Sequence, residues 1–103
     1  MRIEIFVVKT EVNRLVYPEE NTTSLEVIKS EIVHEFGGMT KIPDCKGYWE
    51  EPTKFYVDEV EIWLIYTNST NAREITEAFA KRIKNLTYQK AQAFAIDGNL
   101  YLI

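Results

Sequence analysis

FGGMTKIPDCKGYW, residues 36–49, spans the end of a predicted helix and the start of a predicted strand. Gly37 follows the last apolar residue of the helical pattern, where helices commonly end in the left-handed conformation that glycine adopts without strain. Pro43 lacks a backbone amide, so the strand that contains it belongs at the edge of a sheet. The stretch therefore predicts a helix that turns directly into an edge strand.

The sequence contains two helical patterns. Before residue 36, Thr23 and Glu26 form a capping-box pattern, and apolar residues recur at spacings of three and four, namely Leu25, Ile28, Ile32 and Phe36. Further along, Asn71 with Glu74 predicts a capped start of a second helix, whose apolar stripe is Ile75, Phe79, Ile83 and Leu86. Each stripe predicts one buried helix face.

Strand patterns fill most of the remaining chain. Residues 2–9 alternate, with Ile3, Ile5 and Val7 on one face and Glu4, Phe6 and Val8 on the other. Residues 39–51 form the weak edge strand, and residues 54–67 form the strongest one. Two final segments, 91–96 and 100–103, flank Asp97-Gly98-Asn99, which is a good hairpin signal.

The resulting order is strand, helix, strand, strand, helix, strand, with a short terminal strand added. This is the order of the ferredoxin-like or split βαβ fold, an α+β architecture in which two helices cover one face of an antiparallel sheet. Its second strand lies at a sheet edge, in agreement with Pro43. A chain of 103 residues has the size of one domain, so we expect residues 1–103 to form a single ferredoxin-like domain.

Composition narrows the environment and the partners. A hydrophobic share of 46% supports a packed core, and a net charge of −4 disfavours a nucleic-acid partner, which usually meets a basic surplus. The single cysteine cannot form an internal disulfide, which fits a reducing compartment. The first apolar run is too short for a membrane span or signal peptide. We expect a cytoplasmic protein with no membrane partner.

The strands carry apolar residues on both faces, although the helices of this fold cover only one. With Ile3, Ile5 and Val7 toward the helices, the residues expected on the open face are Phe6, Val8, Trp63 and Ile65. Such a patch is larger than a monomer usually exposes. We expect a homodimer packed sheet to sheet; the terminal strand or a ligand would be other ways to cover the patch.

Gly47-Tyr48-Trp49 is the candidate binding segment. Glycine permits close backbone approach, and the two rings offer rigid apolar area on an edge strand. The alternative is that Trp49 seals the edge of the core and Gly47 marks a bulge. The expected binding residues, close to Tyr66, are Tyr48, Trp49, Tyr56, Glu59, Glu61 and Trp63.

Residues suited to catalysis are few. Glu59 and Glu61 share a strand face about 7 Å apart, which suits acid–base or metal chemistry but is equally typical of a solvated strand. His34, the only histidine, falls off the helical stripe, and Cys45 has no second thiol to work with. The chain carries no P-loop, dinucleotide or zinc motif, so we expect no cofactor and no metal.

Several residues of the quoted stretch carry a resemblance. Phe36-Gly37-Gly38, Thr40, Gly47 and Trp49 make the chain similar to a group of small microbial and phage proteins with an F-G-G-x-T … G-x-W signature. The order of elements agrees over nearly the whole length. The resemblance implies a ferredoxin-like fold and marks residues 40–49 as a signature, and it implies no catalytic residue and no substrate.

Three functions are compatible with the sequence. The favoured one is a homodimeric domain that binds a small ligand or a protein partner. A second is a small dimeric α+β barrel enzyme, with proton transfer by Asp58, Glu59, Glu61 or His34. A third is a nucleotide-binding accessory or inhibitor protein whose phosphates meet Lys41, Lys46 and Lys54, which the net charge disfavours.

Overall fold

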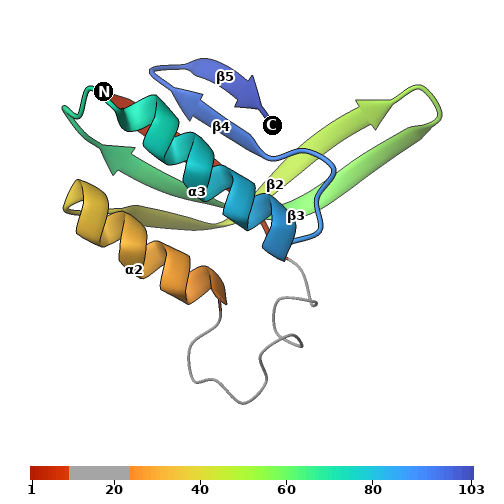
Figure 1. Ribbon diagram of the computed structural model, residues 1–103. Helices are drawn as coiled ribbons and strands as arrows, with labels where there is room; N and C mark the ends of the chain where they lie inside the picture. Colours follow the sequence, from red (N-terminus) through yellow and green to blue (C-terminus); the bar gives the residue numbers. More distant parts are fainter. Residues whose placement is uncertain (10–23) are drawn as a thin grey trace.

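A computed structural model describes residues 1–9 and 24–103, which form strands and helices in the expected order (Figure 1). Along the chain these are β1 (Arg2–Val8), α2 (Ser24–Phe36), β2 (Thr40–Glu51), β3 (Lys54–Tyr66), α3 (Ala72–Leu86), β4 (Ala93–Ile96) and β5 (Asn99–Leu102). The expected boundaries shift by a residue or two at several ends. Thr23, half of the predicted capping box, lies outside the described residues.

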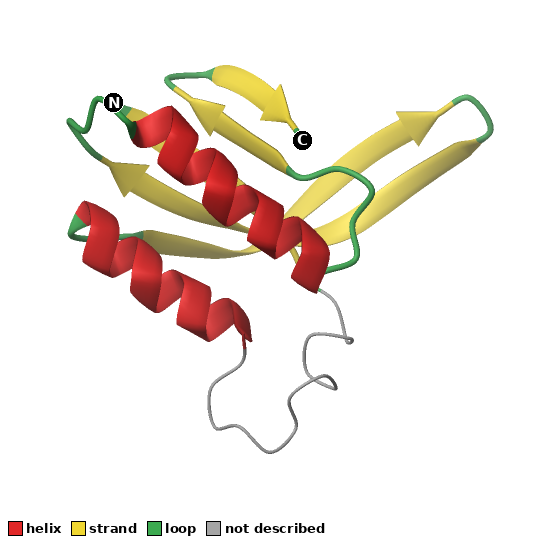
Figure 2. Ribbon diagram, viewed as in Figure 1, coloured by secondary structure: helices red, strands yellow, loops and turns green. Residues whose placement is uncertain are grey.

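The strands form one sheet in the order β2-β3-β1-β4-β5, and each neighbouring pair is antiparallel. Both helices cover the same face (Figure 2). The first four strands have the ferredoxin-like arrangement, and β5 extends the sheet beyond β4. Strand β2 lies at the opposite edge, and Pro43 falls in its bulge between Ile42 and Cys45, outside the regular pairing with β3. The ferredoxin-like prediction is confirmed.

The core lies between the sheet and the helices. Strands β1, β3 and β4 contribute Ile3, Ile5, Val7, Trp63, Ile65, Phe94 and Ile96, and α2 contributes Leu25, Ile28 and Ile32. Helix α3 buries Ala72, Thr76, Ala80 and Ile83, whereas the expected stripe residues Ile75, Phe79 and Leu86 are only half-buried. The small residues at the centre of its buried face bring α3 close to the sheet, and the bulkier ones flank that contact.

Helix α2 ends as predicted, but the start of α3 differs. Gly37 has a φ of 86°, and its amide donates to the carbonyl of Val33 at 2.8 Å, which confirms the left-handed cap. Asn71 occupies the N-cap position of α3, yet its side chain makes no capping hydrogen bond, so the side-chain cap predicted there is wrong. The backbone amide of Asn71 donates to Oγ of Ser69.

The turn between β4 and β5 also follows the prediction. Asp97 and Gly98 have φ values of 49° and 83°. Two successive positive φ angles define the primed turn that joins antiparallel strands with the correct twist. This turn sets the pairing of Ile96 with Asn99 and of Phe94 with Tyr101.

Replacing Gly37 with alanine should lower the free energy of unfolding by about 1 kcal/mol, because an L-residue resists the left-handed region. A Cβ there meets no atom within 4 Å, so the cost is purely conformational. Gly38→Ala is the matched control, since Gly38 also has open space around it and no positive φ. Equal denaturation midpoints for the two variants would contradict this assignment.

Candidate binding surfaces of the sheet

The pairing of β1 with β3 decides which residues face the helices. Ile3 lies opposite Ile65, and Ile5 lies opposite Trp63. Directly opposed residues share a sheet face, so Trp63 and Ile65 join the core, where both are almost completely buried. The expectation that these two residues lie on the open face is therefore wrong. Residues 62–66 of β3 are apolar on both sides of the strand. The alternation of the sequence therefore does not determine which side faces the helices.

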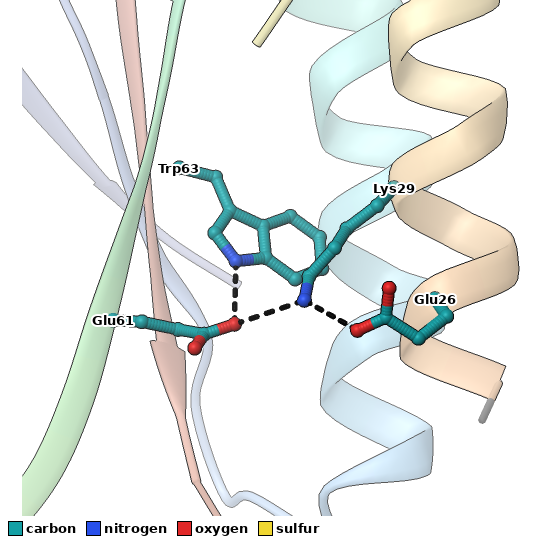
Figure 3. A network of polar contacts seen from close by, with 4 residues as sticks. All are labelled: Glu26, Lys29, Glu61 and Trp63. Carbon is teal, nitrogen blue, oxygen red and sulfur yellow. Dashed lines mark hydrogen bonds and ion pairs between the residues drawn. The ribbon is translucent and has the colours of Figure 1, made fainter. Parts of the chain in front are cut away.

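A polar network surrounds Trp63 on the helix side of the sheet (Figure 3). The indole Nε1 donates to Oε1 of Glu61 at 2.8 Å, and Nζ of Lys29 lies 3.5 Å from the same oxygen. Lys29 also contacts Oε1 of Glu26 at 2.7 Å and lies 5.4 Å from the centroid of the indole. Glu61 is only 6% exposed, so its charge must be balanced inside the protein, and the ammonium group of Lys29 does this. Glu61 and Trp63 thus hold α2 against the sheet.

The open face of the sheet is apolar, as predicted, and it carries Phe6 and Val8 as expected, but Ile62 and Leu64 take the place of Trp63 and Ile65. Ile62 lies opposite Phe6, and Leu64 lies opposite Glu4. The partly or largely exposed apolar side chains that these pairings place on the open face are Phe6, Val8, Ile42, Ile62, Leu64, Tyr66, Leu100 and Leu102. Tyr66, Leu100 and Leu102 are 67%, 59% and 60% exposed. We call the side of the sheet that carries these residues the open face.

The outer half of the β2–β3 hairpin projects from the body of the domain (Figure 1). We call residues 46–59 the arm, because in this region β3 pairs with β2 but no longer with β1. Tyr48 and Phe55 are both more than 60% exposed, and their ring centroids lie 6.2 Å apart. Trp49 lies opposite Tyr56 on the other side of the arm. The arm therefore presents aromatic rings on both of its faces.

Four of the expected binding residues lie on the arm, Tyr48 and Glu59 on one of its faces and Trp49 and Tyr56 on the other. Glu59 is exposed and lies opposite Lys46, whereas Glu61 is buried. The hydroxyl of Tyr56 donates to Oε2 of Glu51 at 3.4 Å. The arrangement offers apolar rings with hydrogen-bonding tips, which suits recognition more than proton transfer.

Gly47 allows the indole of Trp49 to lie over the strand. A Cβ on Gly47 would stand 3.0 Å from Nε1 of Trp49 and 3.2 Å from a methyl of Val60. The bulge considered for Gly47 lies instead between Ile42 and Cys45. Trp49 remains 41% exposed while Val60 beside it is buried. The indole thus covers a buried valine on the open-face side of the sheet and still presents a free edge.

The other catalytic candidates are dispersed. His34 is exposed on α2 and lines an open groove of about 550 Å³ between the two helices, together with Arg82 and Phe79. Cys45 is half-buried, with Sγ 3.6 Å from the carbonyl of Pro43. Within residues 1–9 and 24–103, no three His, Cys, Asp or Glu side chains are grouped as metal ligands.

The lysines considered for phosphate binding are also separated. Lys46 lies opposite Glu59, and Lys54 lies opposite Glu51, at different heights of the arm. Lys41 lies opposite Trp63, nearer to the body of the domain. Two of the three cations thus face an acidic residue on the neighbouring strand, which disfavours a shared phosphate site.

These features define a small ferredoxin-like α+β domain with an apolar open sheet face and a projecting aromatic arm. Among solved structures, the divalent cation tolerance protein (Cut A1) from Thermus thermophilus has a similar fold, with a TM-score of 0.54 and 17% sequence identity. The similarity covers 100% of this chain and 82% of that chain. At this identity the likeness concerns the fold alone.

The sequence comparisons are otherwise negative. No protein-family model matches the chain, and no curated protein matches it. The resemblance carried by Phe36-Gly37-Gly38, Thr40, Gly47 and Trp49 therefore stays a prediction. In the described parts of the chain, neither helix has the length and apolar character needed to span a bilayer.

Lys29→Met should lower the free energy of unfolding by about 2–3 kcal/mol, because it leaves the buried carboxylate of Glu61 without its cation. Lys81→Met is the matched control, since Lys81 meets Glu77 at 3.9 Å on an exposed helix surface. That pair should contribute less than about 0.5 kcal/mol. Urea denaturation of both variants measures the difference, and equal losses would show that the buried network is not stabilising.

Proposed function

We propose that this chain is a self-associating binding domain, in which two copies stack their open faces and the arms recognise a small ligand or a protein partner. The observation that supports the assembly is the open face itself. Both helices lie on the other side of the sheet, and Tyr66, Leu100 and Leu102 are more than half exposed. A contiguous apolar surface of this kind marks an interaction site.

The energetics favour a large apolar contact. Fully burying a large apolar side chain contributes about 1.5–3 kcal/mol. Association opposes this gain with about 4–15 kcal/mol of lost translational and rotational freedom. The open face supplies eight partly or largely exposed apolar side chains from each copy, so stacking two copies doubles the area removed from water.

The charges on the open face do not oppose a second copy as its occupant. The chain carries a net charge of −4, so two copies repel one another at long range. On the open face, however, Glu4 is paired with Arg2 at 3.3 Å. These two residues lie opposite Leu64 and Tyr66, so the charges of this part of the face cancel. Two identical copies related by a two-fold axis can then meet there without like-charge contact.

The arm supplies the surface for recognition of a ligand or partner. Tyr48, Phe55, Trp49 and Tyr56 present large rings that lose little conformational entropy when they bind. The solved neighbour is named for divalent cation tolerance, whereas the proposal for this chain rests on apolar and aromatic surfaces. A small amphipathic molecule or an apolar segment of a partner protein fits these surfaces best.

Leu64→Glu should convert the assembly toward smaller species, because stacking would bury a carboxylate without a partner. Val27→Glu is the matched control, since Val27 is an exposed apolar residue on α2, in the layer opposite the open face. Sedimentation velocity at micromolar concentration compares the two variants with the wild-type chain.

The wild-type chain and Val27→Glu should sediment as the same assembly, and Leu64→Glu as a smaller one. Circular dichroism verifies that each variant is folded, and Tyr66→Glu provides a second test at a more exposed position of the open face. A monomeric wild-type chain at these concentrations would rule out the proposal.

A further inference from the structure

The two edges of the sheet are protected very differently. Strand β2 contains Pro43, a bulge between Ile42 and Cys45, and the charged residues Lys41, Asp44, Lys46, Glu50 and Glu51. These are the devices by which proteins prevent an edge strand from pairing with another chain. Strand β5 at the other edge, read through Ile103, is Asn-Leu-Tyr-Leu-Ile, with no proline and no acidic or basic side chain. Its pairing with β4 is regular.

The backbone of β5 offers free hydrogen-bonding groups to a further strand. Gln92 and Ile103 exchange two backbone hydrogen bonds, at 2.9 and 3.1 Å. In an antiparallel ladder such pairs alternate with pairs that exchange none. Leu102, opposite Ala93, and Leu100, opposite Ala95, are therefore in the second class. Their amides and carbonyls point away from β4, out of the sheet edge.

We propose that β5 pairs antiparallel with β5 of a second copy, so that the two sheets become continuous across a two-fold axis. In this register Leu100 lies opposite the partner's Leu102, and Tyr101 lies opposite the partner's Tyr101 at the axis. The Leu-Tyr-Leu sequence reads the same in both directions, so the pairing is self-complementary. The outward amides of Leu100 and Leu102 donate to the carbonyls of the same two residues in the other copy.

Several contacts hold β5 in a position where it can pair with a second copy. The ring of Tyr101 stacks on Phe94 with centroids 5.2 Å apart, and Arg73 lies 4.6 Å from the centroid of Tyr101, which fixes the strand against α3. The side-chain carboxylate of Asp97, in the turn before β5, accepts a hydrogen bond from the backbone amide of Arg2 at 2.7 Å. Arg2 belongs to β1, so this negative charge is directed away from the edge of β5.

The side chains of β5 also favour a second copy. Leu100 and Leu102 are about 60% exposed, and the two-fold register places each beside a leucine of the other copy. Cross-strand apolar pairs of this kind stabilise an antiparallel sheet. The edge contact uses backbone groups that the face-to-face contact of the proposed function does not use. Both contacts together would produce a tetramer with two kinds of two-fold interface.

The test separates the edge contact from the face contact by working in the Leu64→Glu background, where stacking of the open faces is disabled. If β5 pairs with a second copy, Leu64→Glu sediments as a dimer. Adding Leu102→Pro removes an outward amide without touching the ladder to β4, and the double variant should be monomeric. Leu102→Ala in the same background removes the leucine side chain but keeps the amide, so it should remain dimeric.

Hydrogen exchange measured by NMR supplies a second readout. The amide of Leu100 should exchange at least about tenfold more slowly in the Leu64→Glu dimer than in the Leu64→Glu/Leu102→Pro chain, because a hydrogen bond to the other copy protects it. Tyr66→Glu replaces Leu64→Glu as the background if the latter unfolds.

Each outcome distinguishes the two interfaces. A monomeric Leu64→Glu chain with fast exchange at Leu100 would overturn the edge pairing and leave the face contact standing. A dimer that survives Leu102→Pro in this background would also overturn it. If wild-type chain and Leu64→Glu are both dimers, and Leu102→Pro alone gives a monomer, the edge pairing stands and the face contact of the proposed function fails.

Discussion

The indole of Trp63 lies fully buried between the sheet and the helices, opposite Ile5 on β1, and its Nε1 donates to the buried carboxylate of Glu61. Lys29 of α2 balances the charge of that carboxylate. The side chain of Trp63 thus fixes the orientation of β3 and, through Glu61 and Lys29, the position of the helix. Turning β3 over would expose the indole and leave Glu61 on the wrong side of the sheet. The cost of burying a carboxylate without its cation makes the observed orientation strongly preferred.

The surfaces of the molecule follow from this constraint. With Trp63 and Ile65 in the core, Ile62 and Leu64 must lie on the open face beside Phe6. An antiparallel sheet with a solvated face normally alternates apolar and polar residues, whereas β3 is apolar on both sides over this region. Within the described residues the sheet therefore has two apolar faces, and the helices α2 and α3 cover only one of them (Figure 2). The proposed self-association would cover the second apolar face, and the unprotected edge strand β5 offers a second contact between copies.

Much of the architecture is readable from the sequence, because local signals and topology agree. Gly37, Pro43 and the Asp97-Gly98 turn each require a particular backbone environment, and the structure supplies it. The orientation of β3 was not readable, since a continuous apolar run fits either face. What decides it is the pairing with β1 and the ion pair from Lys29, both of which join residues distant in sequence. For the same reason, Glu61 and Trp63 were expected at a binding site, although they lie in the interior.

Attenuation of methyl signals by a soluble paramagnetic agent tests the face contact most directly. In a single copy, Leu100 and Leu102 are about 60% exposed, whereas Val27 and Val33 on α2 are 43% exposed. Stacking of open faces predicts the reverse order in solution, with the leucine methyls shielded and the valine methyls attenuated. It also predicts shielding of Ile62 and Leu64 on β3, which pairing through the edge of β5 would leave uncovered. If the leucine methyls are attenuated more strongly than those of the valines, as the single copy dictates, the open face is not an interface.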